Sequence, residues 1–202
     1  MIDANLYVAC LVLEGRPALV VGEGPLAREK VEGLELCGAE VNLVASDDYS
    51  ADLLTGCLLV VAATSDMELN RRIFADAEER AMLVNVADVP ELCNFILPAI
   101  VRKPPLTVAI STSGASPALA KRIKREIDER FGAEYARLGE LLDEVRAWAK
   151  ENLATYDDRK RFFEAIVEGD PDPIELLRAG DEAAVRHLII AAQEAASAAS
   201  QR

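Results

Sequence analysis

The first half of the chain alternates short apolar runs with longer segments in which apolar residues recur at helical spacing. Each apolar run has the length and aliphatic character of a β-strand. The runs that predict strands are residues 7–13, 18–21, 41–45, 58–62, 82–86 and 106–110. Helices are predicted at residues 26–37, which Gly38 ends, and at residues 66–80, where Ser65 and Glu68 have capping-box spacing. Strands that alternate with helices are typical of an α/β fold with a parallel, doubly wound sheet.

The pattern becomes almost entirely helical beyond Ser116. Leu119, Ile123 and Ile127 share one face of the first predicted helix there. Basic side chains surround this face, namely Lys121, Arg122, Lys124 and Arg125. The segment 169–173 interrupts the helical half with Gly, Asp and Pro, and residues 181–202 predict a further helix. Because an exposed apolar face needs a partner surface, we expect a homodimer.

Composition narrows the class of protein. The 202 residues include 22 Lys and Arg against 35 Asp and Glu, and the net charge of −13 excludes a generally basic nucleic-acid-binding protein. No apolar run approaches the roughly 18 to 20 residues that span a bilayer, so we expect no membrane insertion. Residues 1–5 lack the features of a signal peptide, which leads us to expect a cytoplasmic protein.

The four cysteines form no Cys-x-x-Cys pair, and we interpret Cys10, Cys37, Cys57 and Cys93 as small buried apolar residues.

A glycine-rich segment follows the predicted strand 18–21 and opens the next helix. It reads Gly22, Glu23, Gly24, Pro25, Leu26 and Ala27. In this context G-x-G-x-x-G/A indicates dinucleotide binding, because the glycines let the backbone approach a diphosphate at the helix N-terminus. A plain tight turn would also need small residues and stays an alternative. Since Pro25 has no N–H to donate and Glu23 adds a negative charge, we expect binding weaker than is usual for this fold.

Dinucleotide-binding folds carry an acidic residue about 20 positions after the glycines, where it binds a ribose hydroxyl. The corresponding residues 42–46 contain no carboxylate, and Asp47 and Asp48 follow them. A preference for NAD over NADP would therefore depend on these two residues.

Two polar residues accompany the end of the strand 82–86. Asn85 and Asp88 fall at the edge where open α/β sheets keep their sites. We interpret Asp88 as a candidate general base, with a turn or capping aspartate before Pro90 as the equally weighted alternative.

The segment 111–117 joins a strand to a helix, with Ser116 at the N-cap position and Pro117 as first helical residue. Its hydroxyls, Gly114 and free N–H groups also form a possible anion site at the helix N-terminus. The basic residues that follow, from Lys121 to Arg125, would suit a ligand rich in carboxylates or phosphates. A solvated helix face is the alternative for that basic cluster.

Several segments in this order resemble the precorrin-2 dehydrogenase/sirohydrochlorin ferrochelatase family, the N-terminal module of siroheme synthases. They are VVGxGxxARxK at residues 20–30, AAT at 62–64 with Asn70, NVxD at 85–88 with FIxPAI at 95–100, and STxGxSP at 111–117. The resemblance runs from about Leu6 through the C-terminal helices. It implies a Rossmann-like NAD-binding domain at residues 1–110, a dimerisation region at 111–145 and a small all-helical domain at 146–202, assembled as a homodimer.

The activity implied by the resemblance is NAD⁺-dependent oxidation of precorrin-2 to sirohydrochlorin, followed in some members by insertion of Fe²⁺ to give siroheme. Asp88 matches the family's catalytic aspartate. The corresponding cofactor positions are Gly22, Glu23, Gly24, Pro25, Leu26, Ala27, Ser46, Asp47 and Thr64, although Glu23 and Pro25 stand where the family usually has a more Gly-rich loop. The matching tetrapyrrole positions are Asn85, Ser113, Gly114, Ser116 and Lys121. A substrate with eight carboxylates would need local cations, which Lys121–Arg125 and Arg102-Lys103 could supply.

The chain also departs from the family pattern. The connection at residues 44–58 is too short for the additional strand that the family carries there, beside the adenosine side of the cofactor site. A chelatase or tetrapyrrole-binding relative with weakened or lost NAD binding is therefore an alternative. A dimeric Rossmann-like protein that senses a nucleotide is a second one.

Overall fold

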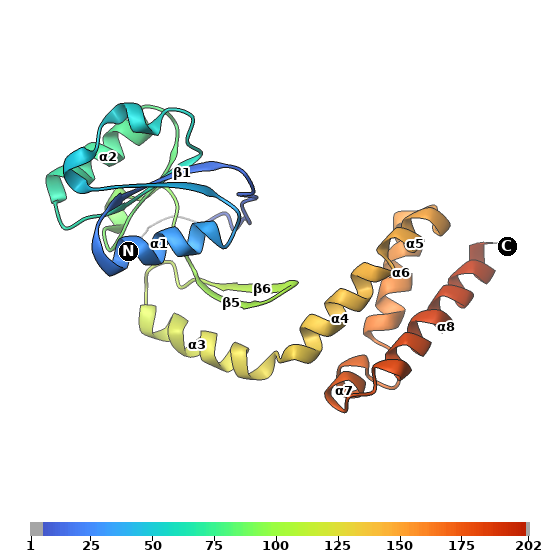
Figure 1. The fold of residues 1–202 in the computed structure, drawn as a ribbon. Helices are drawn as coiled ribbons and strands as arrows, with labels where there is room; N and C mark the ends of the chain where they lie inside the picture. Colours follow the sequence, from blue (N-terminus) through green and yellow to red (C-terminus); the bar gives the residue numbers. More distant parts are fainter. Residues whose placement is uncertain (1–5, 201–202) are drawn as a thin grey trace. The chain divides into compact units, whose positions relative to one another are not determined.

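The computed structural model of the protein describes residues 6–200. The first five residues, on which the expected localisation depends, and residues 201–202 of the last predicted helix lie outside the described residues. The chain forms two compact units, each with its own apolar core (Figure 1). One unit runs to Pro98 and includes Thr112–Pro117, and the other comprises Ala99–Ser111 and the chain from Ala118 onward. The domain boundaries predicted at residues 110 and 145 separate functional regions rather than compact units, so this division does not test them and they stay a prediction.

A parallel sheet forms the centre of the first unit. In the described part of the chain it has four strands in the order β2-β1-β3-β4. These are β1 (Pro17–Gly22), β2 (Glu40–Val44), β3 (Leu59–Ala63) and β4 (Leu83–Val86). The connection between β2 and β3 contains only two 3₁₀ turns, η1 (Ser46–Asp48) and η2 (Ala51–Leu54). The short segment therefore adds no strand to this sheet, in agreement with its length.

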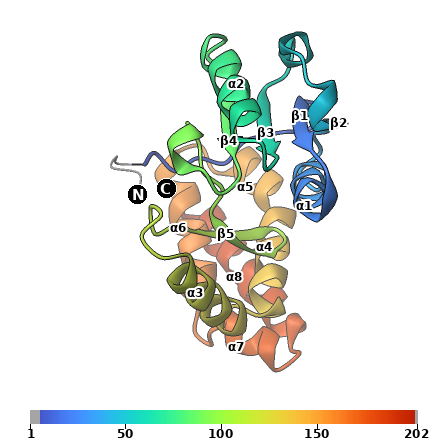
Figure 2. The same cartoon turned by 90° about the vertical axis from the view of Figure 1, so that its left-hand side faces the viewer.

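Helices cover both faces of the sheet (Figure 2). Leu19 and Val21 of β1 pack on the side of α2 (Met67–Glu78), whereas Ala18 and Val20 pack on the side of α1 (Gly24–Glu35). Each fully buried Val or Leu contributes about 1.5–3 kcal/mol. Because both faces are buried, β1 and β3 are continuous apolar runs rather than alternating ones.

The strand predicted at residues 7–13 does not form. Tyr7 and Val12 are exposed, and Leu13 alone of this run is buried, in the core on the α1 side. A strand requires a neighbouring backbone to pair with its N–H and C=O groups, and in the described chain no strand pairs with this run. Cys10 in this run is exposed, so its interpretation as a buried residue was wrong.

The strand predicted at residues 106–110 forms, but it does not belong to the parallel sheet. This strand, β6 (Leu106–Ile110), pairs antiparallel with β5 (Ala99–Lys103) in a two-stranded sheet of the second unit. Only Pro104 and Pro105 connect the two strands, and so short a connection forces a hairpin.

The capping box predicted for α2 is replaced by a different cap. Asp66, not Ser65, is the N-cap residue, and its Oδ1 accepts the backbone N–H groups of Glu68 at 2.9 Å and Leu69 at 3.2 Å. A carboxylate at this position also interacts favourably with the positive end of the helix.

The second unit contains the hairpin and most of the helical half. Its helices are α3 (Pro117–Arg130), which continues from the first unit, α4 (Ala133–Glu144), α5 (Arg146–Asn152), α6 (Tyr156–Val167), α7 (Pro173–Arg178) and α8 (Glu182–Ser200). The predicted break at 169–173 separates α6 from α7. Leu141, Phe162, Ile166 and Val185 are central to the core of the helical bundle.

The apolar face predicted for α3 is partly covered within the chain itself. Ile123 and Ile127 pack against a small core with Val101 and Ile110 of the hairpin. Leu119 remains exposed. The face therefore does not require a second chain to the extent that the sequence pattern suggested.

Candidate functional site

The predicted cofactor residues of the first unit gather at one edge of the parallel sheet. All four strands run in the same direction, so their carboxyl ends meet at this edge. Gly22 ends β1, Ser46 follows β2, Thr64 follows β3 and Asp88 follows β4. Ligands of open α/β sheets bind outside this edge, which makes it the candidate site.

The glycine-rich turn leaves open space where a ligand would approach. At Gly22, which has a φ of +140°, a Cβ atom would lie 2.2 Å from the carbonyl oxygen of Ala63, so no larger residue fits. At Gly24, with a φ of +76°, a Cβ atom would meet nothing within 4 Å. Ala27 is fully buried between α1 and the sheet. Close packing thus requires small residues at positions 22 and 27, whereas Gly24 leaves room for a ligand.

No side chain caps the N-terminus of α1. Glu23 occupies the N-cap position in an extended conformation and makes no capping hydrogen bond, and Pro25 has no N–H. The remaining N–H groups of the first turn therefore have no side-chain acceptor among the described residues. An uncapped helix end next to open space fits the diphosphate of a dinucleotide.

The carboxylate of Glu23 is turned instead toward the end of β2. Its Oε1 accepts the backbone N–H of Ser46 at 2.9 Å, and its Oε2 accepts the Ser46 hydroxyl at 2.8 Å. These two hydrogen bonds, first the backbone one, hold the pKa of Glu23 below its ordinary value. The charge that was expected to lie close to the diphosphate is thus bound to the loop after β2.

Thr64 organises the turn that follows β3. Its hydroxyl donates to Oδ1 of the buried Asn70 at 3.1 Å and accepts the N–H of Asp66 at 3.0 Å. The Asn70 amide returns a hydrogen bond to the Thr64 carbonyl at 3.2 Å. A contact of Thr64 with a cofactor stays a prediction.

Asp88 is an exposed carboxylate in a strained turn. It has a φ of +61°, and the N–H of Val89 donates to the carbonyl of Val86 to close the turn around it. Within the described residues, its side chain makes no hydrogen bond or ion pair and caps no helix. The capping alternative therefore has no contact to support it, whereas a turn residue and a proton acceptor are both compatible with this geometry.

Two neighbouring side chains hold this turn in place. The Cys93 thiol contacts the carbonyl oxygens of Val86 and Val89, each at 3.3 Å, and burial raises its pKa. Asn85 is buried, and its amide donates to the carbonyl oxygen of Phe95 at 3.0 Å. The sequence pointed to Asn85 but not to Cys93, because the return of residues 93–95 to the end of β4 is a tertiary feature.

The predicted serine loop turns sharply before α3. Ser113 and Gly114 are both left-handed, with φ values of +51° and +80°. The Thr112 hydroxyl accepts the N–H of Ser116 at 3.1 Å, and the helix begins at Pro117 as predicted. Thr112 was not among the predicted site residues. The predicted substrate residue Lys121 is exposed on α3 and belongs to the second unit.

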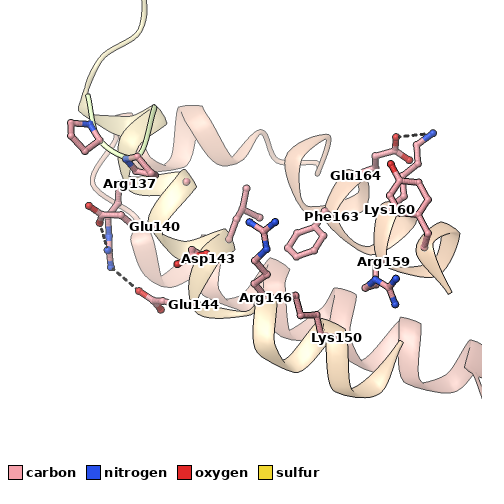
Figure 3. Close-up of a pocket in the computed structure, with 15 residues that line it drawn as sticks. Arg137, Glu140, Asp143, Glu144, Arg146, Lys150, Arg159, Lys160, Phe163 and Glu164 are labelled. Atoms are coloured by element: carbon pink, nitrogen blue, oxygen red, sulfur yellow. Dashed lines mark hydrogen bonds and ion pairs between the residues drawn. The ribbon is translucent and has the colours of Figure 1, made fainter. Parts of the chain in front are cut away.

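The second unit has a pocket of about 1230 Å³ between the β5–β6 turn and helices α4, α5 and α6 (Figure 3). At one end Arg137 is paired with Glu140 and Glu144. At the other end Arg146, Lys150 and Arg159 lie near Phe163 (Figure 3).

The cations at the two ends of this pocket differ in whether carboxylates pair with them. Among the described residues, the side chains of Arg146 and Lys150 form no ion pair or hydrogen bond. Arg159 donates only to the carbonyl oxygens of Leu153, at 2.7 Å, and Ala154, at 3.2 Å. The sequence analysis overlooked these three cations, although Arg146 and Lys150 have the i, i+4 spacing that places them on one helix face.

No group of three or more His, Cys, Asp or Glu side chains in the described part of the chain is arranged to hold a metal ion. None of the described helices is both long and apolar enough to span a membrane.

Family models match the chain in three successive segments. An NAD(P)-binding model matches residues 9–99, the sirohaem biosynthesis protein central model matches 104–130, and the sirohaem synthase dimerisation region matches 134–192. The chain is similar to the siroheme synthase family over most of its length. Its NAD(P)-binding segment contains the glycine-rich turn and Asp88, and its dimerisation segment contains the basic end of the pocket.

Individual relatives support this similarity. The chain is 37% identical over 194 residues to a siroheme synthase of Methylobacillus flagellatus, covering 87% of this chain and 41% of that protein. It is 36% identical over 210 residues to a siroheme synthase of Thioalkalivibrio sulfidiphilus, covering 94% of this chain and 42% of that protein. The chain thus spans about two fifths of the length of these relatives. A solved structure of SirC, precorrin-2 dehydrogenase, matches with a TM-score of 0.71 and 25% identity, over 94% of this chain and all of that one.

Proposed function

We propose that this protein is an NAD-dependent oxidoreductase that converts precorrin-2 to sirohydrochlorin in siroheme biosynthesis. One observation supports this function above the others. The uncapped start of α1 and the unpartnered carboxylate of Asp88 belong to the same sheet edge of a chain similar to the siroheme synthase family. An anion site and a proton acceptor at one edge suit a dehydrogenase, whereas a nucleotide sensor would need only the first.

The glycine-rich turn would bind the cofactor. The N–H groups at the start of α1 would bind the diphosphate of NAD, and the open space at Gly24 admits it. The other proposed cofactor residues, Ser46, Asp47 and Thr64, follow β2 and β3 at the same edge. NAD⁺, when bound, accepts a hydride from the substrate.

Asp88 would take the proton that the substrate loses when the hydride leaves. A carboxylate without an ion-pair partner is free to accept a proton, and its fixed position in the Val86–Val89 turn holds it at the sheet edge. The same carboxylate could accept pyrrole protons as Fe²⁺ enters sirohydrochlorin. Because its side chain has no hydrogen-bond or ion-pair partner among the described residues, Asp88 is compatible with this second activity, in which Fe²⁺ is a substrate.

Cations of the second unit would bind the carboxylates of the tetrapyrrole. Lys121 on α3 was proposed from the sequence, and Arg146, Lys150 and Arg159 now extend the set. Because Arg146 and Lys150 pair with none of the described residues, an anionic ligand would have no ion pair to displace in that part of the chain. We further propose that the protein is a homodimer, on the basis of its sirohaem synthase dimerisation region.

A stepwise spectral assay tests the proposal. Precorrin-2 and NAD⁺ are mixed with the protein, and the absorption of sirohydrochlorin and NADH is followed before Fe²⁺ is added. We expect both products to form together. Iron insertion into supplied sirohydrochlorin without any dehydrogenation would indicate a chelatase that has lost NAD use. If neither reaction occurred and micromolar sirohydrochlorin did not bind, a nucleotide-sensing protein would be the better interpretation.

A further inference from the structure

The end of β2 lacks the acidic residue that a dinucleotide-binding fold normally places there. Such a carboxylate accepts hydrogen bonds from the ribose of the adenosine and repels the 2′-phosphate of NADP. β2 ends at Val44, and Ala45 and Ser46 follow it. The chain nevertheless has a carboxylate at this position in space, because Glu23 reaches it from the neighbouring loop.

The pairing of β1 with β2 explains how Glu23 arrives there. Val21 pairs with Val44, so the residues that follow the two strands leave the sheet side by side. Glu23 lies two residues beyond Val21, and Ser46 lies two residues beyond Val44. The two hydrogen bonds from Ser46, at 2.9 and 2.8 Å, therefore bridge adjacent strand ends rather than distant parts of the unit.

Ser46 orients the carboxylate of Glu23 but uses only part of its capacity to accept hydrogen bonds. Each carboxylate oxygen can accept about two hydrogen bonds, and Ser46 supplies one to each. One acceptor position on each oxygen therefore remains for a pair of hydroxyl groups. Glu23 is exposed, so solvent or a ligand can reach these positions. Its lowered pKa keeps it charged at neutral pH.

We propose that Glu23, held by Ser46, is the carboxylate that binds the adenosine ribose and makes this protein select NAD over NADP. The inference rests on the proposed function only in assuming that a dinucleotide binds at the glycine-rich turn. It replaces the earlier expectation that Glu23 weakens binding through repulsion of the diphosphate. It also assigns the role to Glu23 rather than to Asp47 or Asp48, the carboxylates that follow the position indicated by the sequence spacing.

Calorimetry with the full chain tests the assignment, with NAD⁺ and NADP⁺ as the titrants. The wild type should prefer NAD⁺. Glu23→Gln, which keeps the size of the side chain but removes its charge, should lower NAD⁺ affinity roughly 10-fold, the effect of one lost charged hydrogen bond. Because the repulsion of the 2′-phosphate also disappears, NADP⁺ affinity should not fall, and the preference should shrink by at least that factor.

Four further variants make the result specific. Asp52→Asn removes a charge from the next 3₁₀ turn, η2, and should leave the preference unchanged. Asp47→Asn and Asp48→Asn test the two competing residues directly. Ser46→Ala removes one of the two hydrogen bonds to Glu23 and should reduce the preference by less than Glu23→Gln. Thermal melting of each variant establishes that it folds.

The possible failures can be told apart. If Glu23→Gln leaves the ratio of NAD⁺ to NADP⁺ affinity unchanged, or if only Asp47→Asn or Asp48→Asn reduces it, Glu23 does not select the cofactor. A gain in NAD⁺ affinity in Glu23→Gln would show that Glu23 obstructs the site and would also overturn the proposal. Absence of binding of either dinucleotide to the wild type would instead refute the proposed function, and this inference with it.

Discussion

Single residues at the sheet edge differ in whether their side chains are already engaged. Thr64 and Asn85 use their polar groups to hold neighbouring backbone, which limits what they can offer a ligand. Asp88 has no such partner among the described residues and is held only through its backbone turn. Burial and hydrogen bonding therefore favour Asp88 as the residue that exchanges protons, and the other two as residues that position the loops.

Replacement of Asp88 by Asn should separate binding from turnover. Asn tolerates the left-handed backbone at this position, so the turn should persist. We expect tetrapyrrole binding to remain and the rate of dehydrogenation to fall roughly 10²- to 10⁴-fold, as for the loss of a general acid–base group. Glu91→Gln, which removes an exposed carboxylate close by in the chain, is the matched control. Near-normal rates of both dehydrogenation and iron insertion in Asp88→Asn would exclude a catalytic role for Asp88. The residue would then serve only to form the turn.

At the scale of elements, the helix N-termini differ in how their first N–H groups are satisfied. α2, α6 and α7 are capped by the side chains of Asp66, Thr155 and Asp172. Their first N–H groups are thereby satisfied within the protein. Among the described residues, no side chain caps α1, α4 or α5. At α1 the missing cap coincides with open space at Gly24, and this combination, rather than the missing cap alone, suits an anionic group.

The α2 cap can be tested by stability measurements. Asp66→Ala removes the acceptor of two backbone N–H groups and should lower the free energy of unfolding by about 1 kcal/mol. Ser65→Ala is the control, because the capping-box position that the sequence suggested is not the N-cap. Urea denaturation monitored by circular dichroism measures both. A larger loss in Ser65→Ala than in Asp66→Ala would contradict the observed cap.

The basic end of the helical pocket also makes a testable prediction. The double variant Arg146→Gln, Lys150→Gln removes two cations that lack protein partners. If they bind substrate carboxylates, sirohydrochlorin affinity should fall about 10- to 100-fold, and its dependence on salt should weaken. Arg161→Gln removes a cation of α6 that pairs with Asp158 outside the pocket, and should have little effect. Titration of sirohydrochlorin by visible absorption measures all three proteins, and equal affinities would exclude this pocket from substrate binding.

The whole molecule combines two units with separate cores and a net charge of −13. An acidic protein that binds an anionic substrate must concentrate its cations locally, because the overall field is repulsive. The uncompensated residues Arg146 and Lys150 are one such concentration. The sirohaem synthase dimerisation model matches residues 134–192 of the second unit, so the proposed assembly and the proposed carboxylate binding would involve the same helices.

Light scattering tests the proposed homodimer. At about 10 μM protein in moderate salt, we expect a mass about twice the 21.9 kDa of the 202-residue chain. Because Ile123 and Ile127 of α3 already pack within their own chain, the apolar face of α3 is not sufficient evidence for a dimer. The prediction now depends on the dimerisation region at residues 134–192. A monomeric mass under these conditions would contradict it.

Much of the fold could be predicted from local pattern. The four parallel strands, α1, the break after α6 and the start of α3 at Pro117 follow from apolar periodicity, glycine, proline and capping residues, which act over a few neighbouring positions. The glycine-rich turn and Asp88 were identifiable for the same reason, since each directly follows a recognisable strand. Their positions at a common edge also follow from the parallel arrangement.

Tertiary structure decided the features that depend on pairing between distant segments. Residues 7–13 have the composition of a strand, yet no described strand pairs with them, and residues 106–110 pair with a strand that the pattern did not reveal. Likewise the sequence shows that residue 23 carries a negative charge, but not which groups form hydrogen bonds with its carboxylate. Its hydrogen bonds to Ser46 exist because β1 and β2 are neighbours in register. Local sequence determines which elements can form, whereas backbone pairing across the chain determines which side chains meet.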